Sequence, residues 1–599
     1  METADTLAAP QLQEVVVTGT NHQVATRLLP YSISVVGQER LESTGQTQVL
    51  SAISGMVPSL FVSERGIFGF GVSNGGSGHI KLRGVGGDRA SAVLMMVDGQ
   101  PQFAGIYSHH IADFYDKEYV ERVEVLRGPG SVLYGSNAMA GAINVITKNP
   151  GQQGVHTSLS TQYGSYNTWL SSVTNTTRFG KFSSLVSASY NRTDGNVNDF
   201  DFKQANGYAK IAYDISDTWK SIADYTIMHF NGNDPIYPKL SNPESTDIYR
   251  QNITRGEASL SVSNRYASTS GLIRVYYSYG NHFVDDPRHF HSKDDRTGVM
   301  AYQNFTPWNG ASATVGFDFD TYSGKIPVSG GNNHTEGSMS TIGRKSITEY
   351  SPYITLSQSL AGDMLNLNGG LRMANSDMFE TQWIPQFGFA LNPGCNYTFK
   401  GTIAMGYRNP SFRELYLYRM ANPDLQPEKM INYELSVGKR FSRYFYADIT
   451  AYYSRGNDMI QVLDNKNVNT GKFTNKGIEI TAKSNPLDNL WLFASYSYLN
   501  TSLSNLNGAP KNQYYLGVQL SLWESLGISA DLKGVGGLYV ADDVKDQNYA
   551  LLNLKITYRT CRYFSIFSRL ENITNARYMI NRGYEMPGFT AMGGLKVEF

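Results

Sequence analysis

Beyond about residue 154, apolar and polar positions alternate in segments of about ten residues, which turn residues separate. In residues 397–407 one face of an extended strand would carry Tyr397, Phe399, Gly401, Ile403, Met405 and Tyr407, and the other Thr398, Lys400, Thr402, Ala404 and Gly406. The first face suits lipid and the second suits a wet lumen. The pattern therefore predicts an all-β transmembrane barrel over 154–599.

Residues 25–150 have a different pattern of apolar and polar positions. A helix-like stretch at 49–56 alternates with short β-prone runs at 80–83 and 92–97, and glycines gather between residues 66 and 87. This mixture predicts a compact α+β domain. The glycines predict turns and an apical loop rather than a nucleotide site, because no GxGxxG opens a helix after a strand.

A membrane crossing by helix is excluded by length. The cleanest apolar run, 92–97, is far shorter than the roughly 20 residues that a spanning helix needs, and a closed sheet is the other way to satisfy every backbone group in lipid. Residues 1–5 lack the basic and apolar regions of a signal peptide, so we interpret the sequence as a mature chain given an initiator Met and infer export.

Composition narrows the class further. The chain has 40 Tyr, 28 Phe and 58 Gly with 17% charged residues, which suits a strand-rich protein with aromatic side chains at an interface; a soluble all-β protein is the alternative. The formal net charge is zero, with 51 basic and 51 acidic residues. This balance gives no reason to expect a nucleic-acid partner.

One long motif identifies a family. Residues 120–148 read VERVEVLRGPGSVLYGSNAMAGAINVITK, which resembles almost residue for residue the plug signature of TonB-dependent outer-membrane transporters. At the other end, residues 570–575, Tyr578 and a last alternating strand that ends in Phe599 resemble the closing motif of that family. The resemblance implies a barrel in the outer-membrane lipid of a Gram-negative bacterium, with an N-terminal α+β plug inside its lumen.

Turn lengths orient this barrel. Tight turns such as 179–181 and 392–394 predict the periplasmic end, and longer connections at 231–253, 282–297 and 323–346 predict the outer end. Segmentation gives about 12 strands before Cys395 and about ten after it, hence about 22 antiparallel strands. Cys395 and Cys561 then lie in periplasmic turns eight strands apart. At about 4.8 Å per strand they cannot meet the limit of about 7 Å for a disulfide, so both are predicted to be unpaired.

The N-terminal segment, residues 1–24, contains a short β-prone run formed by Glu14, Val15, Val16, Val17 and Thr18. In its place before the plug (25–150) this run resembles the TonB box. The resemblance implies an exposed segment that pairs as an added strand with the energising TonB complex of the periplasm; an ordinary strand is the alternative.

The charged positions of the plug signature and its neighbourhood are Arg83, Arg122, Glu124 and Arg127. The family resemblance implies that such residues face glutamates of the barrel wall. There they would form a latch that must break or shift for passage; ion pairing that only holds the fold is the alternative.

The family resemblance implies that plug loops at residues 63–79 and 99–114 reach outward, and we expect ligand contact from these loops. The second loop offers amides, aromatic rings and paired imidazoles: Gln100, Gln102, Phe103, Tyr107, His109 and His110. Imidazole can ligate iron or copper, which makes His109 and His110 candidate metal ligands, although adjacent histidines point different ways on a strand. His282, His289, His291, Asp285 and Asp286 form a second cluster, for which a solvated loop is the simpler interpretation.

Residues 406–410 and 422–425 resemble the paired FRAP and NPNL boxes of haem receptors. The span between them holds Tyr416 and Tyr418, both candidate ligand contacts, but no histidine. This departure disfavours haem, and it leaves His109 or His110 as the substitute axial ligand. Similar boxes occur in siderophore and cobalamin receptors.

The resemblance implies TonB-dependent import of a scarce metal chelate, with a ferric siderophore as the leading cargo and haem, cobalamin or copper behind it. No intrinsic cofactor is expected, and a surface lipoprotein is a candidate partner. From other classes, a passive porin and a surface adhesin or enzyme are the alternatives. The sequence has no GxSxG and no HExxH motif, so an enzyme is not expected.

Overall fold

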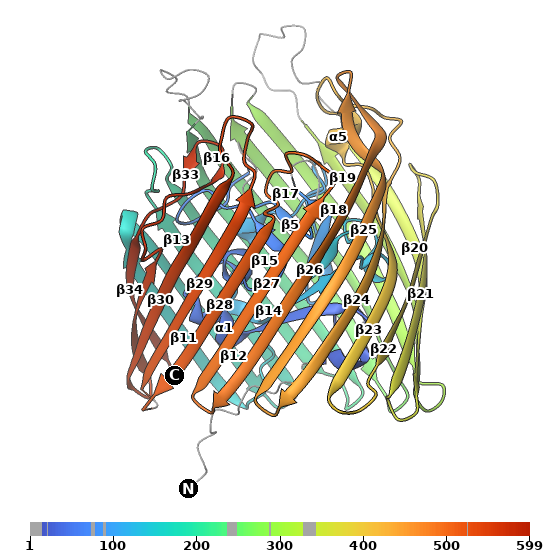
Figure 1. Ribbon diagram of the computed structural model, residues 1–599, viewed down its shortest axis with the longest axis horizontal. Helices are drawn as coiled ribbons and strands as arrows, with labels where there is room; N and C mark the ends of the chain where they lie inside the picture. Colours follow the sequence, from blue (N-terminus) through green and yellow to red (C-terminus); the bar gives the residue numbers. More distant parts are fainter. Residues whose placement is uncertain are drawn as a thin grey trace.

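The computed structural model of the chain describes residues 15–20, 22–72, 78–87, 92–235, 248–286, 289–326, 343–523 and 525–599. These residues form a closed barrel of 22 strands, with the N-terminal domain inside the ring of strands (Figure 1). Both parts of the predicted fold are confirmed. No helix in the described ranges is long and apolar enough to cross a membrane.

Every barrel strand pairs antiparallel with its neighbours in the chain, and β11 closes the ring by pairing with β34. The strands are β11 Gly154–Gly164, β12 Thr168–Phe179, β13 Phe182–Thr193, β14 Phe202–Asp214, β15 Trp219–Pro235, β16 Ile248–Arg265, β17 Thr269–Asp285, β18 Phe290–Phe305, β19 Ala311–Lys325, β20 Lys345–Leu360, β21 Leu365–Ser376, β22 Gln382–Leu391, β23 Tyr397–Arg408, β24 Glu428–Ser442, β25 Phe445–Leu463, β26 Lys466–Leu487, β27 Leu490–Thr501, β28 Asn512–Leu522, β29 Leu526–Leu538, β30 Gln547–Cys561, β31 Phe564–Glu571 and β34 Thr590–Glu598. The outer connections carry α5 Phe412–Tyr416, β32 Met579–Asn581 and β33 Tyr584–Glu585.

The alternation of the strands separates a lipid face from a lumen face. On β24, Leu435 is 65% exposed while its neighbour Glu434 is 5% exposed, and on β23, Ile403 is 50% exposed while Ala404 is 1% exposed. Tyr407 departs from the predicted lipid face, because β23 pairs with β22 only as far as Ala404. Beyond that point the strand meets the plug, and Tyr407 is buried.

The plug is built on a five-stranded sheet of order β3-β9-β10-β7-β8, in which only β10 and β7 run parallel. Its elements are β1 Val15–Val16, β2 Val24–Ala25, β3 Ser32–Gly37, α1 Gln38–Ser43, α2 Val49–Ile53, β4 Leu60–Val62, β5 Ile80–Leu82, β6 Val85–Gly86, β7 Val93–Val97, β8 Gln100–Gln102, β9 Val120–Arg127, α3 Ser131–Tyr134 and β10 Gly141–Thr147. Single-turn 3₁₀ helices occupy Thr26–Leu28, Ala112–Phe114, Lys117–Tyr119 and, between β11 and β12, Ser165–Asn167.

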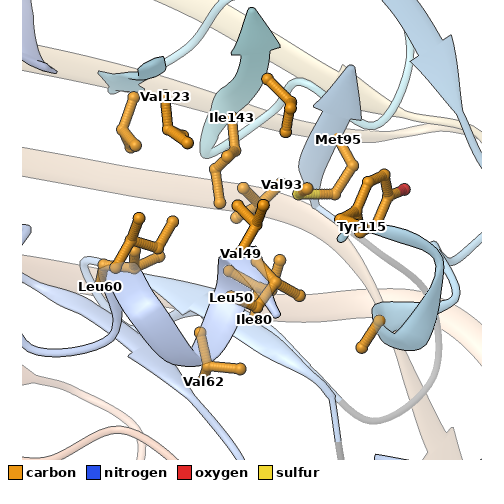
Figure 2. Close-up of a cluster of buried hydrophobic side chains, with 14 of the residues drawn as sticks. Val49, Leu50, Leu60, Val62, Ile80, Val93, Met95, Tyr115, Val123 and Ile143 are labelled. Carbon is orange, nitrogen blue, oxygen red and sulfur yellow. The ribbon is translucent and has the colours of Figure 1, made fainter. Parts of the chain in front are cut away.

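The plug has its own hydrophobic core between α2, the β4-β5-β6 sheet and one face of the five-stranded sheet. Figure 2 shows its members meeting there, and all are buried: Val49, Leu50, Leu60, Val62, Ile80, Val93, Met95, Tyr115, Val123 and Ile143. The predicted helix and both predicted β runs lie in this core as α2, β5 and β7. The plug is thus a packed domain that the barrel surrounds.

The three long connections were predicted too long. Strand pairing continues to Pro235 opposite Ile248, to Val284 opposite Phe290 and to Gly324 opposite Lys345. Near these strand ends polar and apolar side chains no longer alternate strictly along the sequence, so the sequence pattern stops although the backbone ladder goes on. The connection 286–289 is as short as the turns at the other end of the barrel, where the C-terminus lies (Figure 1), whereas 236–247 and 326–344 are longer than those turns.

The cysteines occupy the predicted places. Cys395 lies in the turn before β23 and Cys561 ends β30, both at the periplasmic end, and both are exposed and unpaired. Neither thiol is part of a disulfide.

We therefore expect both cysteines to react with a maleimide from the periplasmic side only. A polyethylene-glycol maleimide too large for general porins should leave intact cells unlabelled and add two labels to the purified chain without reductant, as gel mobility would show. Cys395→Ser and Cys561→Ser should each remove one label. Labelling of intact cells, or labelling only after reduction, would contradict the placement.

Candidate functional site

Strand β9 is the central element of the candidate site. It lies between β3 and β10 in the plug sheet, and its last residue, Arg127, reaches the barrel wall. Glu124, three residues earlier, reaches the N-terminal segment instead. One strand therefore contacts both the segment that precedes the plug and the wall that surrounds it.

The N-terminal segment folds back onto the plug. Val15 and Val16 pair with β2, and the backbone N–H groups of Val17 and Thr18 donate to one carboxylate oxygen of Glu124 at 3.1 and 2.8 Å. Val15 is 49% exposed and Val17 is half-buried, whereas Val16 and Thr18 are fully buried. The expectation of an exposed segment is therefore wrong for Val16 and Thr18, which pack onto the plug where Glu124 accepts from the amides of Val17 and Thr18. Glu14 lies outside the described residues.

Four side chains form a buried ion-pair cluster between plug and wall. Arg83 donates to Glu434 at 2.5 Å and, with two nitrogens, to both oxygens of Glu479 at 2.9 and 2.8 Å. Arg127 donates to the same Glu479 at 2.5 Å. None of the four is more than 5% exposed.

The electrostatics of this cluster favour the charged forms. Burial alone would lower the pKa of Arg83, but the carboxylates of Glu434 and Glu479 raise it above its ordinary value. The fork of Arg83 matches the Glu479 carboxylate in both nitrogens, which is the strong geometry for such a pair. Removal of one partner from a buried pair typically costs about 3–5 kcal/mol, because the other charge is left without compensation.

Two predicted latch residues do not reach the wall. Arg122 donates to Glu121 and to Glu124, each at 2.8 Å, and all three belong to β9. Glu124 is occupied by Arg122 and by the N-terminal segment. The expectation that Arg122 and Glu124 face wall glutamates is therefore wrong. Their side chains lie toward the periplasmic segment, on the opposite side of the ladder from a wall contact.

The first half of the outward plug loop is fixed to the barrel and not presented to solvent. Gln102 donates to Glu257 at 2.5 Å, and Arg296 lies 4.2 Å from the ring centre of Phe103. Gln100 and Gln102 are buried. Gln102 does not face a ligand, because Glu257 of the wall accepts from its amide; Gln100 is buried, and the half-buried Phe103 lies against Arg296 of the wall.

The two candidate metal ligands are not oriented for a shared ion. Nδ1 of His109 donates to the carbonyl of His110 at 2.7 Å, and Nε2 of His110 donates to the carbonyl of Gly78 at 2.7 Å. Burial lowers the pKa of both, to about 3 for His110, so both rings are neutral. In the described part of the chain, no three His, Cys, Asp or Glu side chains gather as a metal site would require.

The second histidine cluster does not form. His282 is buried against Asp294, His289 pairs with Asp285 at 2.7 Å, and His291 donates to Asn281 at 2.8 Å. His282 and His291 lie at the ends of β17 and β18, and His289 lies in the connection between the two strands. Strand alternation sends them to different faces.

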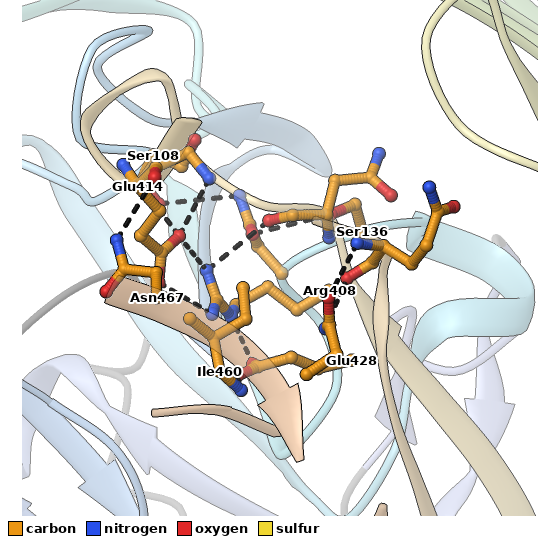
Figure 3. A network of polar contacts seen from close by, with 12 residues as sticks. Ser108, Ser136, Arg408, Glu414, Glu428, Ile460 and Asn467 are labelled. Atoms are coloured by element: carbon orange, nitrogen blue, oxygen red, sulfur yellow. Dashed lines mark hydrogen bonds and ion pairs between the residues drawn. The ribbon is translucent and has the colours of Figure 1, made fainter. Parts of the chain in front are cut away.

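The connection 408–428, which carries the FRAP-like and NPNL-like boxes, folds down onto the plug. Arg408 donates to both oxygens of Glu414 at 2.9 and 3.0 Å and to Glu428 at 2.5 Å, and Figure 3 shows this buried network with Asn467 and Ile460 around it. Burial alone would raise the pKa of Glu414, but Arg408 holds it below its ordinary value. Ser411 and Glu414 also form a capping box at the start of α5. The arginine of the first box thus holds the connection inward.

The folded connection brings two distant tyrosines together. The hydroxyls of Tyr107, from the plug loop, and Tyr418 lie 3.1 Å apart, and the Arg413 guanidinium lies 5.4 and 5.6 Å from their ring centres. All three are half-buried at the outer mouth of the lumen. We name Tyr107, Arg413 and Tyr418 the mouth cluster; it combines aromatic faces with a cation.

Tyr416 lies apart from this cluster. Its ring is 4.9 Å from the Lys345 ammonium, and its hydroxyl contacts the sulfur of Met378. The sequence analysis did not predict Arg413, because between the two boxes it considered the aromatic residues. A basic residue among aromatic residues in an outer connection could have indicated it.

Known proteins match both parts of this architecture. The family model for the TonB-dependent receptor-like β-barrel matches residues 146–573, and the model for the TonB-dependent receptor plug domain matches residues 25–142. The vitamin B12 transporter BtuB of Vibrio vulnificus is 23% identical over 626 residues, across 98% of this chain and 95% of that protein. The iron-regulated outer membrane virulence protein of Vibrio cholerae is 23% identical over 654 residues, with the same coverage of each.

Solved structures share the fold. A mutant of the ferric enterobactin receptor PfeA of Pseudomonas aeruginosa, in complex with enterobactin, has a TM-score of 0.78 at 17% identity and covers 95% of this chain and 99% of its own. The siderophore receptor PiuA of Acinetobacter baumannii has a TM-score of 0.80 at 13% identity, over 99% and 100%. Plug, barrel and sequence agree: the chain belongs to the TonB-dependent receptor family of the outer membrane.

Proposed function

We propose that this receptor imports a ferric siderophore across the outer membrane, driven by TonB, with no cofactor of its own. The observation that carries the proposal is the double attachment of β9: Glu124 holds the N-terminal segment, and Arg127 holds Glu479 of the wall. A pull on the segment therefore loads the strand that carries the latch.

The latch consists of Arg83 and Arg127 against Glu434 and Glu479. Separation of these two arginines from their carboxylates would cost several kcal/mol. This cost fits a plug that stays in the barrel until TonB supplies work. The two-residue strand β1 is short and has an exposed residue, Val15, so a periplasmic partner can take it as an added strand.

A metal chelate suits the outer mouth better than a bare ion. The mouth cluster offers tyrosine faces and a guanidinium, which suit an aromatic, anionic ligand by stacking and charge. The relatives named for iron regulation, siderophores and vitamin B12 support a chelated metal as cargo. A ferric siderophore with aromatic, negatively charged groups is our leading candidate.

Haem, cobalamin and copper rank behind it. His110 is buried and hydrogen-bonded, and His109 donates to a carbonyl, so neither is aimed outward as an axial ligand or a copper ligand. A similarity to a vitamin B12 transporter keeps cobalamin in the panel. A surface lipoprotein that delivers cargo remains part of the hypothesis, and tight binding of cargo by the purified barrel alone would remove the need for it.

The passive-porin alternative makes a different demand. A porin needs a persistent aqueous passage, whereas here a packed domain with its own core fills the lumen and is tied to the wall. The conductance of single barrels in a planar membrane separates a porin from a plugged transporter.

Replacement of Val16 by proline should abolish uptake while surface binding persists. Proline removes the N–H that an added strand needs. Import of the labelled ferric chelate should fall to the level of cells that lack TonB, whereas Val16→Ala should keep most of it. Import by Val16→Pro at the wild-type rate would refute the role of β1.

Replacement of Glu479 by glutamine should loosen the plug. It leaves Arg83 and Arg127 short of a carboxylate, and we expect a local cost of about 3–5 kcal/mol. Amide exchange in β9 should speed up, and the current through single barrels in a planar membrane should rise from a near-closed level. Glu121→Gln, at the exposed pair with Arg122, should cost less than about 1 kcal/mol. Equal rates of amide exchange in β9 of Glu479→Gln and Glu121→Gln would contradict the role of Glu479 in the latch.

Replacement of Tyr107 or Tyr418 by alanine should weaken cargo binding by about tenfold or more, as for aromatic hot spots. A panel of ferric siderophores, haem, cobalamin and copper would first be screened by native mass spectrometry, and the retained ligand titrated by fluorescence quenching. Tyr163→Ala, on the exposed outer face of β11, is the matched control and should bind normally. Retention of haem would overturn our ranking; unchanged affinity in both variants would remove the mouth cluster from the site.

A further inference from the structure

The outward plug loop makes a tight turn at residues 104–109, where the N–H of Ala104 donates to the carbonyl of His109 at 2.8 Å. Ile106 lies within this turn, next to Tyr107 of the mouth cluster, and is 2% exposed. A large apolar side chain in a short turn has too few neighbours in its own loop to be buried by them. Other parts of the molecule therefore cover Ile106.

The wall strand β19 supplies part of this cover by a close approach. The side chain of Ile106 lies directly on Gly324, where a Cβ atom would overlap Cδ1 of Ile106 and lie 2.9 Å from its Cγ1. Gly105 shows the reverse arrangement, since a Cβ there would lie 2.7 Å from the carbonyl oxygen of Ser323. Carbon atoms in contact are best about 3.5–4.0 Å apart, and neither glycine has a positive φ. Close packing between loop and wall is thus what calls for glycine at both positions.

The folded connection 408–428 covers the other side of Ile106. Cδ2 of Phe412 lies 3.5 Å from where a Cβ of residue 324 would be, and Phe412 and Ile106 belong to one buried hydrophobic cluster. In the described part of the chain, the other fully buried members of this cluster belong to the barrel and its outer connections. The backbone N–H of Arg413 donates to the carbonyl oxygen of Ile106 at 2.9 Å. Plug, wall and connection therefore meet at Ile106.

We infer that Ile106 is the residue that positions the mouth cluster. This cluster takes Tyr107 from the plug, and Arg413 and Tyr418 from the connection. The side chain of Ile106 fixes the loop that carries Tyr107 on β19, and its carbonyl oxygen holds the backbone of Arg413. The spacing of the two tyrosine rings and the guanidinium is therefore set by a residue too buried to contact a ligand. That the cluster receives a chelate rests on the proposed function; its assembly by Ile106 does not.

The exchange rate of the Arg413 amide in the purified full-length receptor tests this role without a ligand, by mass spectrometry with fragmentation to single residues. Gly324→Ala forces a methyl group against Ile106, and Ile106→Ala empties the contact. Each should speed the exchange by about tenfold or more. The double variant should return to within about threefold of the wild-type rate, because the new methyl group occupies space that Ile106 vacates. Ile106→Val, which keeps the branched Cβ, should also stay within about threefold.

Ile347→Ala and Gly593→Ala are the matched controls. Ile347 of β20 is fully buried in the same hydrophobic cluster, and a Cβ at Gly593 would meet no atom within 4 Å beyond its chain neighbours. Both variants should leave the Arg413 exchange rate within about threefold of wild type. Heat-modifiable gel migration shows that each variant forms the closed barrel. A wild-type rate in Gly324→Ala, a double variant faster than both single variants, or an Ile347→Ala as fast as Ile106→Ala would overturn the inference.

Titration with a ferric tris-catecholate, which is aromatic and anionic, then connects this position to cargo. Gly324→Ala should weaken its binding by about tenfold, and the double variant should recover most of the affinity. Unchanged affinity with faster exchange would contradict the mouth cluster as the cargo site, yet support its assembly by Ile106. A wild-type receptor that binds no chelate would contradict the proposed function, while the exchange rates still decide the role of Ile106. The two proposals therefore fail separately.

Discussion

Arg83 and Arg127 of the plug are buried against Glu434 and Glu479 of the barrel wall, at N–O distances of 2.5 to 2.8 Å. These residues join the plug to β24 and β26 of the wall across a lumen that would otherwise be an open passage. Charges so deeply buried are costly unless each is matched. A few atoms therefore hold this side of the plug to the wall, and a second buried ion pair, Arg65 with Asp234 of β15 at 2.7 Å, holds the plug at another place.

The route from the periplasm to these atoms is short. Glu124 accepts from the N-terminal segment, and Arg127, on the same strand, donates to Glu479. The mouth cluster lies at the other end of the lumen and contacts the plug through Tyr107. A pull on the N-terminal segment and a ligand bound at the mouth cluster therefore act on the same packed domain. This arrangement suits transport that requires both the pull and the ligand.

The sequence predicted the architecture well, because apolar and polar residues alternate along the barrel strands and the plug contains a long family motif. The local sequence pattern was enough to predict the number of barrel strands, the turns that hold the cysteines, α2, and the plug strands β5 and β7. The side-chain partners could not be predicted in this way. In the sequence, Gln102, Arg122 and Arg83 are equally plausible contacts for a ligand or for the wall. Only the fold shows that Gln102 donates to Glu257, Arg122 to Glu124 and Arg83 to Glu479. Arg413 escaped because its role depends on how residues 408–428 fold back, which no periodicity encodes.

The network around Arg408 differs from the latch in one respect that matters for how such receptors change. The ion pairs of Arg408 with Glu414 and Glu428 and the bond of Ser411 to Glu414 all lie within 21 consecutive residues, and Ile460 and Asn467 complete the network from β25 and β26. Arg83 and Glu479, by contrast, are separated by 396 positions. A segment whose ion pairs are internal can be exchanged between receptors as a cassette, from the end of β23 to the start of β24, together with its contacts to Ile460 and Asn467. The outer mouth can therefore diverge toward new cargo while the machinery beneath it is left intact.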